Sequence, residues 1–286
     1  MTEPIHLALP KGRMQEGIFR LLGDAGVRIS VGSRAYRPTL SLSGFEVKLL
    51  KPQNIVEMLH AGTRDLGFAG ADWVAEKQAE LVRVLDTGLD PVRVVAAAPT
   101  EMLEGGALPK RHLVVASEYA RLTRGWIAQK GLDARVVRTY GATEVFPPED
   151  ADVIVDNTAT GATLRANGLT IVDEVMRSST GLYAHPAALD DPEKRGGIEH
   201  LAMLLRSVLE ARRRVMLELN VTVEGLEAVV AILPCMRQPT VSRLHGEAGY
   251  AVKAAVLREG LPLLIPRLKA AGGSDIVVSP VGQIVP

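Results

Sequence analysis

The sequence predicts an α/β protein with a largely parallel sheet, followed by a smaller C-terminal unit that has its own order of elements. Short apolar runs alternate with amphipathic segments through the first two thirds of the chain, a pattern typical of helices layered on a sheet. Residues 211–286 instead follow the order β-α-β-β-α-β, which is the ferredoxin-like unit. The length of 286 residues suits roughly two domains of about 150 residues each, with three small domains as the alternative.

Each element expected in the first part has a local signal. The strands are short runs rich in Val, Ala, Leu and Ile, which is typical of buried strands. The helices repeat apolar residues every three or four positions, and several end at glycine. The expected strands are Ile5–Pro10, Phe45–Leu50, Asp65–Gly70, Val92–Ala98, Leu113–Ala116, Ala134–Thr139 and Asp152–Val155. The expected helices are Arg13–Ala25, Pro52–Gly62, Ala71–Gln78 and Glu118–Lys130.

Two irregular stretches interrupt this pattern, and a long helix leads into the C-terminal unit. Pro and Gly are dense in Gly141–Asp152, which we interpret as a loop near a site, and Pro186–Gly197 is the second irregular stretch. Ile198–Arg212 then has one apolar face and ends in cationic residues, as suits a helix C-terminus. The C-terminal elements are expected at Val215–Asn220, a helix capped by Thr222, Thr240–Leu244, Ala251–Val256, Leu263–Ala271 and Ile276–Ser279.

Composition argues against several classes of protein. The chain has 33 Lys and Arg and 33 Asp and Glu, whereas a nucleic-acid binder usually has a basic excess. The single cysteine, Cys235, excludes an internal disulfide and suits a reducing compartment. No apolar run is long enough for a membrane span, and the N-terminus lacks the features of a signal peptide. We therefore expect a cytoplasmic enzyme or small-molecule binder that interacts with neither nucleic acid nor membrane.

The strongest local signal is a short loop after an apolar strand. The apolar run Val153–Val155 is followed by an acid, Asp156. A hydroxyl-rich segment then leads into the start of a helix. Backbone N–H groups at a helix N-terminus favour an anion, and α/β sheets bind ligands beyond the carboxyl ends of their strands. The residues expected to hold a phosphorylated sugar are Asp156, Thr158, Thr160, Gly161, Ala162, Thr163 and Leu164. A turn that only caps a helix has the same spacing and stays an alternative.

This loop resembles the phosphoribosyl pyrophosphate loop of phosphoribosyltransferases, which pairs acidic residues with a Thr-Gly-x-Thr turn. It departs from the common type I pattern, because it is one residue shorter and Asn157 replaces the second acid. Segments along the whole chain, in order, are similar to ATP phosphoribosyltransferase: Leu9–Arg13, Lys51–Ile55, Asp65–Asp72, Gly141–Val145, Thr160–Leu169 and, in the regulatory domain of the long form, Leu233–Val241 and Leu268–Ile276. One departure is Asn157-Thr158-Ala159, where many members carry Leu-Val-Ser.

The resemblance implies a two-lobed catalytic part like a type II periplasmic binding protein, followed by a ferredoxin-like regulatory domain. Lobe I would comprise residues 1–92 and 178–210, lobe II residues 93–177, and the regulatory domain residues 211–286, with crossings near Arg93 and Arg177. The long form is typically a homo-hexamer, with a dimer as the alternative here, and needs no separate regulatory subunit.

The implied reaction transfers a 5-phosphoribosyl group from phosphoribosyl pyrophosphate to N1 of ATP and releases pyrophosphate. It is the committed step of histidine biosynthesis and is inhibited by histidine. Mg²⁺ carried by the substrates would neutralise the leaving group, and no protein metal site is expected, because the six histidines lack metal-ligand spacing.

Both substrates are polyanions, so the implied site must contain cationic side chains. The ATP-binding candidates are Lys11, Arg13, Lys51, Gly70 and Asp72. The catalytic candidates are Lys11, Arg13, Asp72 and Glu144; Asp72 or Glu144 would accept a proton from the exocyclic amine or orient it, with a solvated loop carboxylate as the alternative for each. Inhibitory histidine would contact Asn220, Gln238, Thr240 and Ala254.

Two other functions compete with this prediction. One is a non-catalytic solute-binding or sensor protein on the same two-lobed fold, which the Thr-Gly-x-Thr loop disfavours. The other is a phosphoribosyltransferase with a different nitrogen nucleophile, which the full-length resemblance disfavours. Pyrophosphate release with ATP separates all three.

Overall fold

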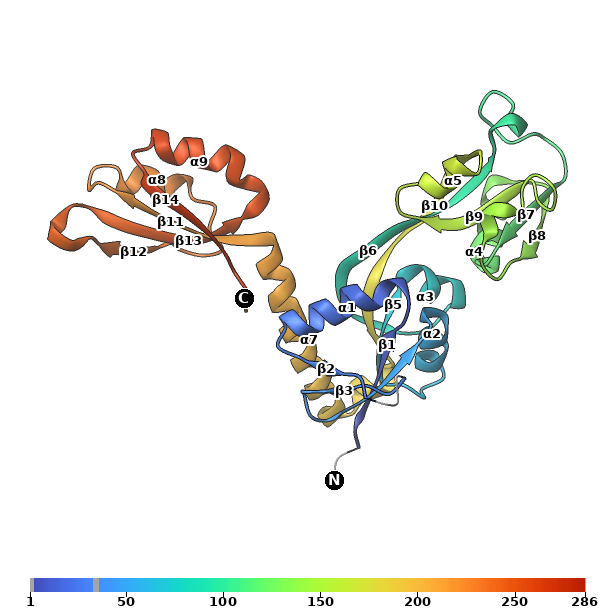
Figure 1. The fold of residues 1–286 in the computed structure, drawn as a ribbon, viewed down its shortest axis with the longest axis horizontal. Helices are drawn as coiled ribbons and strands as arrows, with labels where there is room; N and C mark the ends of the chain where they lie inside the picture. Colours follow the sequence, from blue (N-terminus) through green and yellow to red (C-terminus); the bar gives the residue numbers. More distant parts are fainter. Residues whose placement is uncertain (1–2, 33–35, 286) are drawn as a thin grey trace. The chain divides into compact units, whose positions relative to one another are not determined.

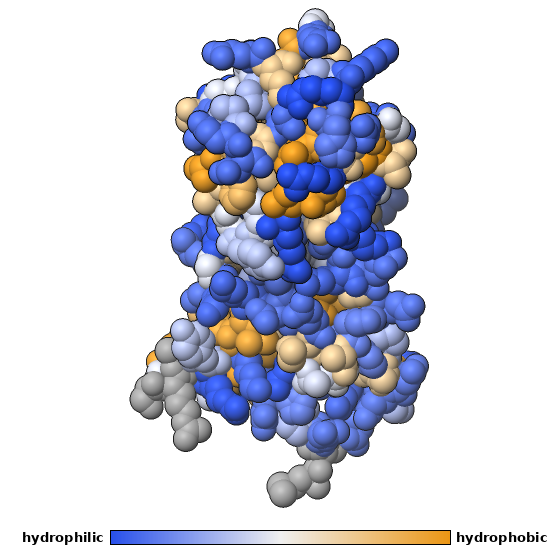
Figure 2. Space-filling view, turned by 90° about the vertical axis from the view of Figure 1, so that its right-hand side faces the viewer, coloured by the Kyte–Doolittle hydropathy of each residue, from blue (hydrophilic) through white to orange (hydrophobic). Residues whose placement is uncertain are grey.

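The computed structural model describes residues 3–32 and 36–285, and contacts divide the chain into two compact units. The first unit comprises Met1–Gly23 and Val27–Ala202, and the second comprises Asp24–Gly26 and Met203–Pro286. The face of the molecule in Figure 2 is mainly hydrophilic, with hydrophobic residues in small patches between polar ones. None of the helices within the described ranges combines the length and the apolar character that a membrane span requires.

The first unit is built on one eight-stranded sheet in the order β4-β1-β5-β10-β6-β9-β7-β8. The strands are β1 (Ile5–Pro10), β4 (Phe45–Leu50), β5 (Leu66–Gly70), β6 (Val82–Pro99), β7 (Leu113–Ser117), β8 (Ala134–Arg138), β9 (Val153–Thr158) and β10 (Leu169–Ala184). A separate pair is formed by β2 (Ile29–Ser30) and β3 (Thr39–Leu40). In Figure 1 the long strands β6 and β10 run side by side from one end of this unit to the other.

The predicted two-lobed α/β architecture is confirmed. In lobe I, β4, β1 and β5 are parallel and are accompanied by α1 (Arg13–Asp24), α2 (Pro52–His60) and α3 (Ala71–Lys77). In lobe II, β9, β7 and β8 are parallel and are accompanied by α4 (Ala120–Lys130) and α5 (Ala162–Ala166). Short 3₁₀ turns occur at η1 (Thr100–Met102), η2 (Thr143–Val145), η3 (His245–Glu247) and η4 (Arg258–Gly260). Figure 1 shows the two lobes joined by β6 and β10.

The centre of the sheet differs from the largely parallel arrangement that we expected. Strand β10 is antiparallel to both β5 and β6, and β6 is antiparallel to β9. The pairing of β6 with β10 shifts register five times between Leu169 and Ala184, so neither strand keeps an alternation of buried and exposed residues. This irregularity explains why the sequence predicted only Val92–Ala98 of β6 and no part of β10.

The stretch Pro186–Gly197 is helical, contrary to the expected irregular segment. It contains α6 (Pro186–Asp190) and the start of α7 (Pro192–Arg213). Both helices begin with proline, which is favoured at the first helical position because it has no N–H to leave unpaired. Gly197 lies inside α7, where a Cβ atom would come within 2.5 Å of Ile5, so close packing explains a residue that usually weakens helices.

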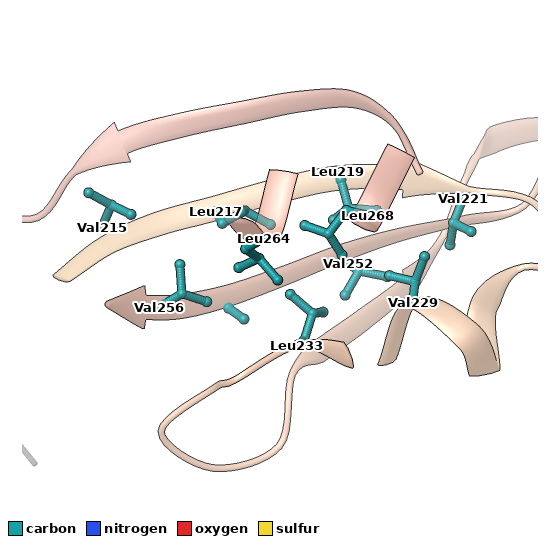
Figure 3. Packing of buried hydrophobic residues seen from close by; sticks show 11 residues of the cluster. Val215, Leu217, Leu219, Val221, Val229, Leu233, Val252, Val256, Leu264 and Leu268 are labelled. Atoms are coloured by element: carbon teal, nitrogen blue, oxygen red, sulfur yellow. The ribbon is translucent and has the colours of Figure 1, made fainter. Parts of the chain in front are cut away.

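The second unit has the predicted ferredoxin-like fold. Its strands β11 (Arg214–Val221), β12 (Thr240–Arg243), β13 (Tyr250–Leu257) and β14 (Ser274–Pro280) form an antiparallel sheet in the order β12-β13-β11-β14. The helices α8 (Leu226–Ile232) and α9 (Leu261–Ala270) pack on one face. Every second residue of β11 is buried in this core, and Figure 3 shows Leu217 and Leu219 next to Leu264 and Leu268.

Candidate active site

A polar cavity of about 190 Å³ is lined by both lobes of the first unit and by the strands between them. Lobe I contributes side chains at the carboxyl ends of β1 and β5 and at the start of α2, and lobe II contributes Tyr119 and Asn157. The lining residues are Lys11, Arg13, Met14, Pro52, Gln53, Gly70, Asp72, Trp73, Asp90, Val92, Tyr119, Asn157, Ser178, Ser179 and Thr180. Four of the predicted residues, Lys11, Arg13, Gly70 and Asp72, thus lie around one cavity.

Asp72 is the centre of a buried hydrogen-bond network that joins the lobes. The residue is only 5% exposed; Tyr119 donates to Oδ2 at 2.6 Å and Ser178 donates to Oδ1 at 2.6 Å. The backbone N–H of Asp72 donates to the Ser178 hydroxyl at 3.0 Å. Trp73 packs against the Tyr119 ring, with 4.7 Å between ring centroids. Both oxygens of Asp72 are therefore occupied by donors from other elements.

This buried environment keeps Tyr119 protonated and restricts which residue can stand next to Asp72. Burial, followed by the negative charge of Asp72, raises the pKa of Tyr119 far above its usual range, so the phenol stays protonated and donates. Gly70 is required beside it, because a Cβ atom there would lie 2.2 Å from Asp72 Oδ1. The close contact at Gly70, predicted as an ATP-binding residue, is thus with the Asp72 side chain.

A second cavity, of about 610 Å³, lies on lobe I and carries a concentration of positive charge. It shares Lys11 with the first cavity; its residues are Lys11, Tyr36, Arg37, Lys48, Leu49, Leu50, Lys51 and Asn54. Repulsion by Arg64, then burial and repulsion by Arg37, lowers the pKa of Lys48. Lys51 is the N-cap of α2 and makes no side-chain capping bond, so its charge adds to the positive helix end. Clustered cations of this kind suit a polyanion.

The predicted phosphate loop is folded on itself by its own hydroxyl groups. Thr158 accepts from the N–H of Gly161 at 2.9 Å, and Thr160 accepts from the N–H of Ala162 at 3.3 Å. Gly161 has φ +75°, a conformation that favours glycine. Leu164 is buried in the lobe II core. Of segment 156–164, Asn157 lines the 190 Å³ cavity, and the predicted binding residues are not among its lining residues.

Three carboxylates gather at the carboxyl ends of β7 and β9. Burial raises the pKa of Asp156 to about 6; the backbone N–H of Asn157 opposes this shift, and the charges of Glu118 and Glu144 add to it. Burial also raises the pKa of Glu118, against the charges of Lys51 and Arg138. The predicted residues Asp156 and Glu144 are therefore electrostatic neighbours, and Lys51 of lobe I interacts with Glu118 of lobe II.

Several site residues had no usable signal in the sequence. Ser178, Ser179 and Thr180 lie on β10, which was not predicted, and Tyr119 was expected only as part of a helix. Asp90 lines the cavity with φ +47°, a backbone conformation that an L-residue rarely adopts. Such a backbone angle cannot be recognised from the sequence alone.

In the second unit, three of the four residues predicted to bind histidine share a cavity of about 530 Å³. Gln238, Thr240 and Ala254 line it together with Cys235, Met236, Arg237, Lys253, Met216, Ala255, Ile284 and Val285. Asn220 is not among the lining residues, and its amide donates to Asp275 at 3.1 Å.

Comparisons with known proteins agree with this architecture. A profile of the ATP phosphoribosyltransferase family (HisG) matches residues 51–207, and one of the HisG C-terminal domain matches residues 211–283. The chain is 37% identical to ATP phosphoribosyltransferase of Pelotomaculum thermopropionicum over 287 residues, or 99% of each chain. It is 36% identical to the enzyme of that name in Pelodictyon phaeoclathratiforme, over 100% of this chain and 99% of that one.

Among solved structures, the ATP phosphoribosyl transferase (HisG:HisZ) complex from Thermotoga maritima matches with a TM-score of 0.62 and 26% identity. The match covers 98% of that chain but 71% of this one. The near-complete matches to curated relatives and the additional C-terminal domain lead to one conclusion: this chain belongs to the ATP phosphoribosyltransferase family, the transferases of the first step of histidine biosynthesis, in its long form.

Proposed function

We propose that this enzyme transfers the 5-phosphoribosyl group of phosphoribosyl pyrophosphate to N1 of ATP, with histidine as feedback inhibitor. The observation that carries the proposal is the cavity between the lobes, which Lys11 and Arg13 of lobe I line together with Asn157, at the strand end that leads into the phosphate loop. Both substrates are polyanions, and the cationic cavity on lobe I continues from Lys11.

In the proposed reaction the lone pair of adenine N1 attacks C1 of the ribose. The C1–N1 bond forms, the bond from C1 to the pyrophosphate oxygen breaks, and the electron pair leaves with pyrophosphate. We assign the polyphosphate groups to Lys11, Arg13 and Lys51, whose charges compensate the developing anion. The backbone of Gly161, Ala162 and Thr163 and the hydroxyls of Thr158 and Thr160 would hold the 5-phosphate once the loop exchanges its internal bonds for the ligand.

The carboxylates take different parts in this proposal. Asp156 would accept hydrogen bonds from the ribose hydroxyls, which requires its ionised form. Asp72 already accepts two hydrogen bonds, so we assign it the orientation of the adenine amine rather than proton transfer. Glu144 is partly exposed and close to Asp156, and it is our candidate for accepting the proton that the exocyclic amine loses.

Mg²⁺ would enter this site with the substrates. The described ranges contain no cluster of three or more His, Cys, Asp or Glu side chains arranged for a metal ion, and the cavities present cations, hydroxyls and amides beside the two carboxylates of Asp72 and Asp90. These groups fit a magnesium ion held by phosphate oxygens, where it neutralises the leaving pyrophosphate.

The C-terminal unit is proposed to bind histidine in its 530 Å³ cavity, where Arg237 and Lys253 can pair with the carboxylate of an amino acid. Because the chain carries this unit itself, we propose a homo-oligomer, a hexamer or a dimer, without a separate regulatory subunit.

The test is pyrophosphate release with phosphoribosyl pyrophosphate, ATP and Mg²⁺, with and without histidine. We expect ATP-dependent release that histidine inhibits, and a loss of about 100-fold or more in kcat/KM for Lys11→Ala. Exposed Lys110→Ala on lobe II is the matched control and should keep wild-type kinetics. Absence of release would favour a binding protein, and release with another base would favour a different phosphoribosyltransferase.

A further inference from the structure

Asn157 lies at the point where the phosphate loop meets the cavity between the lobes. It occupies the second-last position of β9, half-buried, directly between Asp156 and Thr158. Its side-chain amide donates to the Tyr119 hydroxyl at 2.9 Å, and the same Nδ2 lies 3.4 Å from Asp156 Oδ1. Its backbone N–H also donates to Asp156 Oδ1, at 2.6 Å. One residue therefore contacts both the loop carboxylate and the buried tyrosine.

The directions of these hydrogen bonds are set by chemistry. An amide nitrogen only donates, so the phenolic oxygen of Tyr119 accepts from Asn157. The phenol has a single proton, which must then go to its other partner, Asp72, at 2.6 Å. Asp72 in turn accepts from Ser178 on β10. A continuous chain thus runs from Asp156 of lobe II through Asn157 and Tyr119 to Asp72 of lobe I.

The two ends of this chain are the carboxylates that the proposed function assigns to different substrates. Asp156 is assigned to the ribose of one substrate, and Asp72 to the adenine amine of the other. Ribose hydroxyls that donate to Asp156 would hold it in the ionised form, which is also the form that accepts from Asn157. When the Asn157 amide is fixed in this way, the Tyr119 hydroxyl continues to donate its hydrogen bond to Asp72. Hydrogen bonds in such a chain strengthen one another.

On this geometry we propose that Asn157 is a positioning residue that makes the binding of phosphoribosyl pyrophosphate and of ATP mutually dependent. The inference rests on the proposed function and deepens it. If Asn157 only filled space, its replacement would weaken the binding of each substrate separately. The effect of one substrate on the affinity for the other would then be unchanged. The mutual effect is therefore the quantity to measure, since coupling between two sites is reciprocal.

The experiment is a two-substrate matrix of initial rates on the full chain, without histidine. For each substrate it gives the ratio of the dissociation constant in the absence of the other substrate to the Michaelis constant in its presence. We expect a ratio of about 5 or more in the wild type, within the usual range of coupling between sites. Asn157→Leu, similar in size but unable to donate, should bring the ratio close to one.

Tyr119→Phe removes the middle of the chain and should lower the ratio as Asn157→Leu does, with no further loss in the double variant. Gln129→Leu, the same kind of change on the exposed side of α4, is the matched control and should keep the wild-type ratio. Thermal unfolding of each variant checks that it folds.

The inference is overturned by an unchanged ratio in a folded Asn157→Leu variant, or by a wild-type ratio near one. Either result leaves the proposed reaction intact, because transfer is still observed. A wild-type enzyme that releases no pyrophosphate from these substrates refutes the proposed function, and the coupling between its substrates falls with it.

Discussion

The ionised side chain of Asp156 destabilises the folded protein, although the proposed reaction uses it to bind the ribose. Burial raises its pKa from 3.8 to about 6, and Glu118 and Glu144 add negative charge around it. The folded protein thus holds this proton more tightly than the unfolded chain does. Ionising Asp156 therefore lowers the free energy of unfolding as the pH rises from about 4 through 6, and the loss is complete above that range. Such a cost is typical of a group kept for binding.

Asp156→Asn is accordingly expected to stabilise the folded protein and to lower its catalytic efficiency at the same pH. At pH 8 its Tm should exceed that of the wild type, and most of this difference should be lost at pH 4, where Asp156 is protonated in the folded state and only about half ionised in the unfolded chain. Loss of a charged hydrogen-bond acceptor should lower kcat/KM for phosphoribosyl pyrophosphate by about 10- to 100-fold. Thermal unfolding at both pH values and steady-state kinetics at pH 8 measure the two effects.

Glu149→Gln is the matched control, since it makes the same kind of change at an exposed carboxylate. A variant at position 156 that loses stability at pH 8, or that binds phosphoribosyl pyrophosphate as well as the wild type does, would contradict the assignment.

At the scale of elements, α3 of lobe I caps α4 of lobe II. The N-cap residue of α4, Tyr119, makes no capping bond with its side chain. Instead the Glu76 carboxylate accepts from the backbone N–H groups of Arg121 and Leu122, at 3.0 Å each. A negative charge at this end also suits the helix dipole. The contact holds Tyr119 beside Trp73 and Asp72, and all three residues line the 190 Å³ cavity.

Glu76→Ala should therefore destabilise the first unit by about 1–2 kcal/mol, the usual value of a lost cap. Glu76→Gln keeps an acceptor oxygen but loses the charge, and should lose less. Thermal unfolding ranks the variants, and Trp emission reports the Trp73–Tyr119 contact. Equal stability of Glu76→Ala and the wild type would show that solvent caps α4 equally well.

Regular elements could be predicted from the sequence, and the irregular ones could not. The boundaries of β1 and β4 agree with the predicted strands, because a single run of apolar residues determines each of them. Strand β10 was missed because its bulges remove the alternation on which strand prediction depends. Lys11, Arg13 and Asp72, which line the cavity, could be proposed as site residues because they follow strand ends, whereas Tyr119 enters the lining only through the packing of α3 on α4.

At the scale of the whole molecule, the chain carries two sets of polar cavities, in separate units with separate cores. Coupling between them does not require a shared site; it requires only that histidine bind one functional state of the enzyme better than another. The shift in activity is then limited by that difference in affinity. Substitutions in the C-terminal cavity should for this reason change inhibition and leave the catalytic constants unchanged.

Gln238→Ala is expected to weaken inhibition by histidine about tenfold or more, because a hydrogen bond to a charged group of the ligand contributes about 1.5–3 kcal/mol. Thr240→Ala should act in the same direction, and kcat and both Michaelis constants without histidine should stay at wild-type values. Val241→Ala, on the exposed edge strand next to Thr240 but outside the cavity lining, is the control. Histidine titrations of all three variants decide the matter: undiminished inhibition in both cavity variants would mean that histidine acts elsewhere, and reduced kcat without histidine would mean that the cavity supports catalysis directly.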